Sequence, residues 1–256
     1  MKLSTPKSHP RFLSLYYRDL LSEGVKRNIT SLQGLTAHGR GETFDYLIGE
    51  RTESFARKAI ESSAALLILA KHPILSVNGN TAILIPKEYV ELANLLGAHI
   101  EVNIFHAGKK REKNIADYLK KYGAKKILLP DSGKIPGIES NRRMINNLGQ
   151  AKADVIFVPL EDGDRTGALK KMGKKVITVD LNPMSRTAQK ADITIVDNIV
   201  RVMPILISQV KKMKNESTSY LKKILNGYDN SKILSLSLLH IDTRLKKLAS
   251  RESSHF

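Results

Sequence analysis

The segment spanning residues 38–52, HGRGETFDYLIGERT, places an arginine between two glycines. Glycine has no Cβ, so we expect the backbone beside Arg40 to approach a ligand closely or to adopt positive φ. A guanidinium held in this way can bind a phosphate or a carboxylate through two hydrogen bonds. The segment therefore indicates an anion-binding site, although an arginine in a solvated loop would show the same pattern.

Six short apolar runs are each followed by glycine, acidic, amide or hydroxyl residues. They span residues 74–77, 99–105, 125–130, 154–160, 175–181 and 193–196. Strands separated by helices of about ten residues form parallel sheets, which bind ligands beyond the carboxyl ends of their strands. We therefore expect one ligand-binding edge formed by residues 78–81, His106, residues 130–133, 161–166 and 180–187, and Asp197 with Asn198.

These polar groups also have structural interpretations. Either Asp164 or Thr166 is expected to cap the helix that begins near them, and Asn198 is a candidate cap for a later helix. The Asn182-Pro183 pair is typical of a turn. The sequence leaves the structural and the ligand-binding interpretations open at each position.

Several familiar cofactor and catalytic patterns are absent from the sequence. The NGNT stretch at residues 78–81 lacks the lysine of a Walker A loop, and there is no GxGxxG motif. Cysteine is absent, which excludes disulfides, thiolate zinc sites and cysteine nucleophiles. The seven histidines show no metal-ligand spacing. Any nucleotide site must therefore use a different motif.

The net charge of +17 favours anionic partners, among them nucleotides, phosphorylated metabolites and nucleic acid. Aromatic residues make up only 5% of the chain and tryptophan is absent, which argues against a nucleic-acid partner because few side chains can stack on bases. No apolar run approaches the roughly 18 residues that cross a bilayer, and the N-terminus does not resemble a secretory signal. We therefore expect a cytoplasmic protein with no membrane partner.

The alternating pattern predicts an α/β fold, in which helices cover both faces of a parallel sheet. We expect a helical N-terminal segment over residues 1–72, an α/β core over 73–210 and a helical appendage over 211–256. Within the core, helices are expected at about residues 85–96, 109–122, 140–150 and 164–173. The appendage is expected to be broken near Asn215 and at residues 226–230.

An ordered set of motifs resembles one known family, the archaeal phosphopantothenate synthetases, also called 4-phosphopantoate–β-alanine ligases. The motifs are SHPR (8–11), HGRGETFDYLIGERT (38–52), SVNGNTA (76–82), EDGDRT (161–166) and DLNPMSRTAQKADITIVDNIVR (180–201). The resemblance covers about residues 6–205. It implies a Rossmann-like fold and a homodimer. It also implies synthesis of 4′-phosphopantothenate for coenzyme A from 4-phosphopantoate, β-alanine and ATP, with AMP and pyrophosphate released through an acyl-adenylate.

The resemblance also implies roles for individual residues. ATP, accompanied by Mg²⁺, would contact Arg18, Arg40, Asp180, Leu181, Asn182, Arg186, Thr187, Asn198 and Ile199. Asn78, Asn80 and Glu161 are candidates for contacts to 4-phosphopantoate or β-alanine, and Arg40, Asn78 and Glu161 form the expected catalytic set. The metal ligands are not indicated. His106 and Ala107 stand where the family is expected to have a tyrosine-arginine pair.

Two other functions fit parts of the pattern. A Rossmann-like oxidoreductase or transferase would explain the alternating strands but lacks its GxGxxG fingerprint. A nucleic-acid-binding protein would explain the charge but leaves the polar strand ends without a role.

Overall fold

The computed structural model describes residues 5–105 and 108–252 and contains a six-stranded, fully parallel sheet in the order β3-β2-β1-β6-β7-β8. When the six strands of this sheet are numbered in chain order, leaving out β4 and β5 of a separate ribbon, the order is 3-2-1-4-5-6. This is the strand order of the doubly wound Rossmann fold. Five of the six strands fall within the predicted apolar runs and β1 begins one residue before its run, so the expected α/β fold is confirmed. The strands are β1 (Pro73–Val77), β2 (His99–Val102), β3 (Ile127–Leu128), β6 (Val155–Phe157), β7 (Lys175–Val179) and β8 (Ile193–Ile195).

Strand β1 shows why both faces of the sheet must be covered. Successive side chains of a strand point to opposite faces. Ile74 packs into one buried cluster with Ile156 and Val176, whereas Leu75 and Val77 pack into another on the opposite face. Because both sets are apolar, neither face can remain in contact with water.

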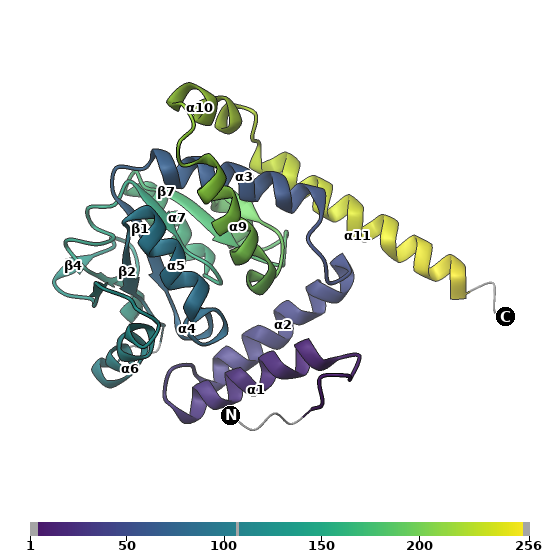
Figure 1. Cartoon of the computed structure of the whole chain (residues 1–256), viewed down its shortest axis with the longest axis horizontal. Coiled ribbons are helices and arrows are strands. Elements are labelled where there is room, and N and C mark those ends of the chain that lie inside the picture. Colours follow the sequence, from purple (N-terminus) through teal and green to yellow (C-terminus); the bar gives the residue numbers. More distant parts are fainter. Residues whose placement is uncertain (1–4, 106–107, 253–256) are drawn as a thin grey trace.

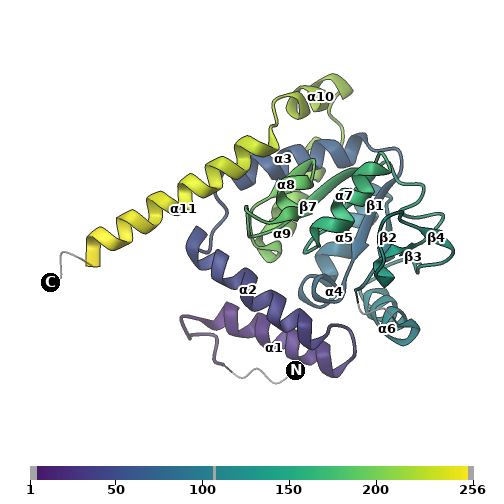
Figure 2. The ribbon, with the colours of Figure 1, turned by 180° about the vertical axis from the view of Figure 1, so that it is seen from behind.

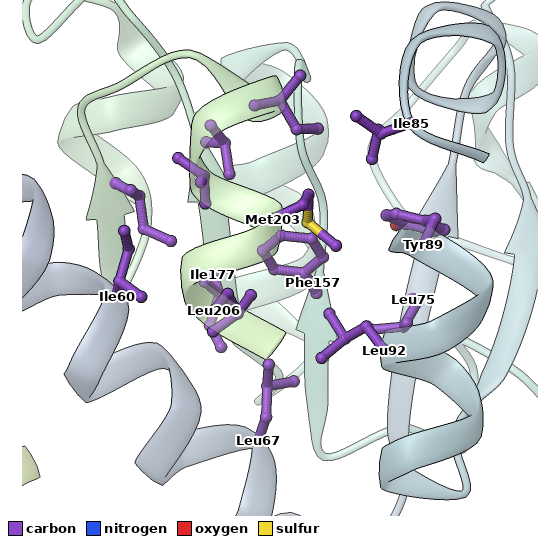
Figure 3. Close-up of a cluster of buried hydrophobic side chains, with 14 of the residues drawn as sticks. Ile60, Leu67, Leu75, Ile85, Tyr89, Leu92, Phe157, Ile177, Met203 and Leu206 are labelled. Carbon is purple, nitrogen blue, oxygen red and sulfur yellow. The ribbon is translucent and has the colours of Figure 1, made fainter. Parts of the chain in front are cut away.

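Helices form the two outer layers. On one face lie α3 (Ser54–Leu69), α5 (Pro86–Leu96) and α9 (Ile199–Met213), and on the other lie α7 (Gly163–Lys171) and α8 (Arg186–Lys190) (Figures 1 and 2). Figure 3 shows Tyr89 of α5 and Met203 of α9 gathered around Phe157 in the core of the first face. The fully buried Ala59 of α3 has only a methyl group, which allows α3 to pack closely against α9.

The helix predicted over residues 140–150 is wrong. The chain instead forms a single 3₁₀ turn (η1, Asn141–Arg143) followed by β5 (Met144–Ile145), which pairs with β4 (Gly133–Lys134) in a separate antiparallel ribbon. The amide of the buried Asn103 donates hydrogen bonds to the carbonyls of Arg142 (3.1 Å) and Met144 (3.0 Å). A side chain distant in sequence therefore satisfies backbone groups that a helix would otherwise have paired.

The first two helices of the chain pack against each other and against the short helix α4 (Gly79–Leu84). These are α1 (Phe12–Lys26) and α2 (Leu32–Ile48), which lie beside one end of the sheet in Figure 1. Helix α6 (Lys109–Lys120) packs beside α4 and α5.

The C-terminal part is helical, with the two predicted breaks. Helix α10 (Thr218–Asn226) is followed by α11 (Asn230–Glu252), which extends away from the sheet in Figure 1. The His240 ring of α11 hydrogen-bonds through Nε2 with the Ile48 carbonyl oxygen at 2.9 Å, which joins this helix to the end of α2. Within residues 5–105 and 108–252, no helix combines the length and the apolar character needed to cross a membrane.

Candidate functional site

A cleft of about 540 Å³ opens beyond the carboxyl ends of β1 and β6. These neighbouring strands flank the point where the strand order reverses, which is where doubly wound sheets bind their ligands. Residues 78–80 line the cleft after β1, and residues 160–162 line it after β6. Helix α2 lines the opposite side.

The predicted site residues divide into two groups by position. Seven line the cleft: Arg40, Asn78, Asn80, Glu161, Leu181, Asn198 and Ile199. Five do not line it: Arg18, Asp180, Asn182, Arg186 and Thr187. Of the expected ligand-binding edge, residues after β1, β6, β7 and β8 line the cleft, whereas residues 130–133, after β3, do not.

Arg40 reaches the cleft from within helix α2, so of the two expectations for its flanking glycines the positive φ is wrong, as is the alternative of a solvated loop. Gly39 and Gly41 both lie inside the helix, and neither has positive φ. Ser31 caps the start of α2 by accepting a hydrogen bond from the Gly34 N–H (3.2 Å). The helix ends at Gly49, which adopts the left-handed conformation (φ 104°).

Three polar strand-end residues are helix N-caps. Asn78 accepts from the Thr81 N–H (3.0 Å) at the start of α4. Asp162 accepts from the Arg165 N–H (2.8 Å) at the start of α7, so the expectation that Asp164 or Thr166 caps this helix is wrong. The predicted capping role of Asn198, which begins α9, is confirmed. Each cap fixes a helix start beside the cleft.

Gly79 allows the connection between α1 and α2 to approach the cleft. A Cβ at this position would lie 2.3 Å from the Ile29 carbonyl oxygen, well inside van der Waals contact. On the same side of the cleft, the Asn80 amide donates to the Gly34 carbonyl (2.8 Å) and the Thr30 hydroxyl contacts the Asn80 side-chain oxygen. Residues 78–80 therefore anchor the start of α2 above the sheet.

A buried ionic cluster anchors the other end of α2. Asp45, which is 5% exposed, pairs with Arg201 and accepts a hydrogen bond from Asn198 Nδ2 (2.7 Å). Arg201 also pairs with Asp197, which accepts from the Thr52 hydroxyl (2.6 Å). The cluster joins α2 to the start of α9, and so sets the position of Arg40 relative to the cleft.

Glu161 lies beneath the cleft, with only 1% of its side chain exposed, and pairs with both Arg142 and Arg165. Arg165 also donates to the Ser76 hydroxyl (3.1 Å) and to the Gln150 side-chain oxygen. Burial lowers the pKa of Arg165 to about 10, so this guanidinium remains charged at neutral pH. The carboxylate of Glu161 is held between two cations.

The turn after β7 positions Leu181 in the wall of the cleft. Asp180 accepts hydrogen bonds from the Asn182 N–H (2.9 Å) and the Ser185 hydroxyl, and burial raises the pKa of the Asp180 carboxyl. The hydroxyl of Thr187, at the start of α8, donates to the Glu161 carbonyl (2.8 Å). The side chains of Asp180 and Ser185 thus stabilise the turn, and Thr187 joins it to the segment that follows β6.

The two remaining predicted arginines are paired with acids. Arg186 contacts the exposed Asp164 at 3.0 Å. Arg18 contacts Glu42 at 2.8 Å and lines a second, shallower depression on the α1 side of α2. His38 and Glu42 line both depressions, so the two adjoin across α2.

Comparison with known proteins adds an independent observation. The sequence model of the family described as phosphopantothenate/pantothenate synthetase matches residues 55–244. The chain belongs to this family. It is 52% identical over 249 residues to a 4-phosphopantoate–beta-alanine ligase from Thermococcus kodakarensis, covering 96% of this chain and 95% of the relative. A ligase of the same name from Methanosarcina mazei is 45% identical over 245 residues, covering 96% and 97%.

The family match begins after the first two motifs and extends beyond the last motif on the C-terminal side. The ordered motifs end near residue 205, whereas the phosphopantothenate synthetase model continues to residue 244. It therefore includes α10 and most of α11. The sequence of these C-terminal helices is therefore part of the region matched by the family model.

Several cleft residues of this family member were not indicated by the sequence pattern. They are Thr30, Ile104, Phe105, Arg111 and Arg142. Arg142 falls in the segment wrongly predicted as a helix, and its guanidinium carbon lies 5.7 Å from the centre of the Phe105 ring. No motif signals this residue, because long-range contacts place it in the cleft. His106 and Ala107, which follow Phe105, lie outside the described residues.

Proposed function

We propose that the chain condenses 4-phosphopantoate with β-alanine to give 4′-phosphopantothenate, using ATP and releasing AMP and pyrophosphate, in coenzyme A biosynthesis. The observation that carries this assignment is the 52% identity, over nearly the full length of both chains, to a protein named 4-phosphopantoate–beta-alanine ligase. The cleft at the reversal of strand order, with arginines in its lining, supports it.

The proposed reaction has two steps. A carboxylate oxygen of 4-phosphopantoate attacks the α-phosphorus of ATP, and pyrophosphate leaves. The amine of β-alanine then attacks the activated carbonyl, and AMP leaves with the electron pair of the broken bond. Such chemistry depends on holding the reactants together and stabilising the moving negative charge more than on a protein nucleophile.

We assign the nucleotide to the side of the cleft formed by α2, β7 and β8. Arg40 is proposed to hold ATP phosphates, while Leu181, Asn198 and Ile199 contact the rest of the nucleotide. The adjoining turn contributes Asp180, Asn182, Arg186 and Thr187 to the proposed ATP set, and Arg18 completes it from α1. Asn78 and Glu161 are proposed to act beside the reacting carboxylate together with Arg40.

The residues present fit Mg²⁺ as an ion carried by the nucleotide. Within residues 5–105 and 108–252, no three histidine or acidic side chains come together as a metal site. Mg²⁺ commonly retains several waters and binds substrate phosphates with one or two carboxylates. It would supply charge neutralisation at the triphosphate, and we propose Glu42, in the cleft lining, as a carboxylate available to it.

Product analysis tests the proposed function. Purified protein given ATP, Mg²⁺, 4-phosphopantoate and β-alanine should release AMP in proportion to 4′-phosphopantothenate. Release of ADP, or AMP release that does not require 4-phosphopantoate, would refute the assignment.

A variant tests the role of Arg40 within that function. Loss of a charge-assisted hydrogen bond to phosphate costs about 1.5–3 kcal/mol, so Arg40→Gln should lower kcat/KM for ATP by about 10- to 150-fold. The matched control is Arg57→Gln, at an exposed position of α3 that lines neither depression. Equal kinetics for the two variants would exclude a phosphate contact by Arg40.

We also infer a homodimer and a cytoplasmic location. Helix α11 presents large apolar side chains to solvent in the single chain, which supports burial against a second copy. They are Leu236, Leu238, Leu239, Leu245 and Leu248. Light scattering should give twice the mass of one chain, and a monomer mass at all concentrations would contradict the dimer.

Cell fractionation should recover the protein in the cytoplasmic fraction, and recovery with the membranes would contradict this location.

A further inference from the structure

Arg142 lies in the half of the cleft opposite the proposed nucleotide side. The cleft runs across the sheet edge from the ends of β7 and β8, where Leu181 and Ile199 lie, to the end of β2, where Ile104 and Phe105 lie. Arg142 belongs to this second half, because its backbone is bound by Asn103 after β2 and its guanidinium lies over the ring of Phe105. The two halves can therefore hold different reactants.

The guanidinium of Arg142 is buried but not fully satisfied. The residue is 8% exposed, and its Nη1 contacts both Glu161 and Asp162 (2.8 Å to Asp162). Its Nε is buried and has no hydrogen-bond partner in the part of the chain that the structure describes. Burial, followed by the nearby charge of Arg165, lowers the pKa of Arg142 to about 10. A charged group in this state gains from a further anionic partner.

The two carboxylates beside Arg142 differ in how firmly they are held. Glu161 is 1% exposed and also pairs with Arg165, so it cannot leave. Asp162 has 40% of its side chain exposed, and only its Oδ2 contacts Arg142, because Oδ1 caps α7 through the Arg165 N–H. Asp162 is therefore the partner that an incoming anion can replace.

The walls of this half combine positive charge with apolar side chains. Arg111 lines it in addition to Arg142, and Ile29, Leu84 and Ile104 provide an aliphatic surface. 4-Phosphopantoate is a short hydroxy acid with a phosphate ester at one end, a carboxylate at the other and geminal methyl groups between them. Its phosphate matches the arginines, and its methyl groups match the aliphatic wall.

We propose that Arg142 binds the phosphate of 4-phosphopantoate by exchanging Asp162 for it, so that this half of the cleft selects the phosphorylated acid over pantoate. The assignment rests on the proposed function. With the phosphate at Arg142 and the methyl groups on the aliphatic wall, the carboxylate of the substrate points along the cleft toward Arg40 and the nucleotide side.

Calorimetric titration of the full chain with 4-phosphopantoate, with pantoate and with ATP tests this assignment. Arg142→Gln should weaken 4-phosphopantoate binding by about 10- to 100-fold, because a charge-assisted bidentate contact is lost. Binding of ATP and of pantoate should change by less than about two-fold, since neither places a phosphate at Arg142. The KM for 4-phosphopantoate in the AMP-release assay should rise in parallel.

A second variant keeps the test decisive if Arg142→Gln does not fold. Asp162→Asn retains an N-cap of equal quality but removes the carboxylate that competes for Arg142. It should tighten 4-phosphopantoate binding several-fold and leave ATP binding within about two-fold. The two variants thus shift the same affinity in opposite directions.

Three outcomes would overturn the assignment. These are unchanged 4-phosphopantoate binding in Arg142→Gln, an equal loss of pantoate or ATP affinity in that variant, and weaker 4-phosphopantoate binding in Asp162→Asn. A wild-type protein that neither binds 4-phosphopantoate nor releases AMP would overturn the proposed function itself, and the role of Arg142 with it. Normal wild-type AMP release with any of the first three results would overturn the role of Arg142 alone.

Discussion

Glu101, in β2, has a buried carboxyl group whose protonation should affect the free energy of unfolding near neutral pH. It is 0% exposed and accepts hydrogen bonds from the Asn146 N–H (2.9 Å), the Gln150 N–H (2.6 Å) and Gln150 Nε2 (2.8 Å). Burial raises the pKa of Glu101 to about 7, although these hydrogen bonds and the charge of Arg165 act in the opposite direction.

The sign and size of the effect follow from this pKa. The ordinary value for the carboxyl is 4.5, so between 4.5 and about 7 the folded protein holds a proton that the unfolded chain has released. The resulting stabilisation is complete at low pH and is lost as the pH rises through the folded-state pKa. Integrated from about pH 5.5 to about pH 8.5, the loss amounts to about 2 kcal/mol in the free energy of unfolding.

Urea denaturation of the wild type and of Glu101→Gln at these two pH values measures the effect. Glutamine cannot titrate, so the wild type should lose about 2 kcal/mol relative to the variant between the lower and the higher pH. Glu139→Gln, at an exposed position, is the matched control for removal of a carboxylate. If wild type and Glu101→Gln show the same pH dependence, the carboxyl of Glu101 does not carry a proton in the folded protein near neutral pH.

Two further changes test how α2 is held above the cleft. Gly79→Ala should lower the free energy of unfolding by about 1–3 kcal/mol in urea titrations, because the new Cβ meets a carbonyl oxygen at 2.3 Å. Gly39→Ala, a helical position with no atom near the new Cβ, should be neutral or stabilising; similar losses in both variants would contradict the close approach at Gly79. Asp45→Asn should cost about 1.5–3 kcal/mol through its lost charge pair with Arg201, measured in the same way. Asp117→Asn, in an exposed pair on α6, should cause no measurable change, and an equal change at both sites would contradict an anchoring role for Asp45.

The strands and the location of the cleft could be predicted from sequence because they depend on local composition. Residues 155–160, for example, are apolar at every position, as expected of a short strand covered on both faces. Polar residues such as Asn78 and Asn198 follow these runs because helix starts need capping groups, so the edge where they gather is visible in the sequence. The order of the motifs also identified the family, because motifs are found in the sequence without any knowledge of contacts.

The composition of the site was decided by tertiary structure. The helix predicted over residues 140–150 does not form, because the amide of Asn103 donates hydrogen bonds to the carbonyls of Arg142 and Met144. The same contact brings Arg142 into the cleft, which no motif indicated. Arg18 and Arg40 were both expected to contact ATP, yet they line different depressions on two sides of α2. Local sequence thus indicates most of the strands and helices, whereas long-range hydrogen bonds and ion pairs bring particular side chains together in the cleft.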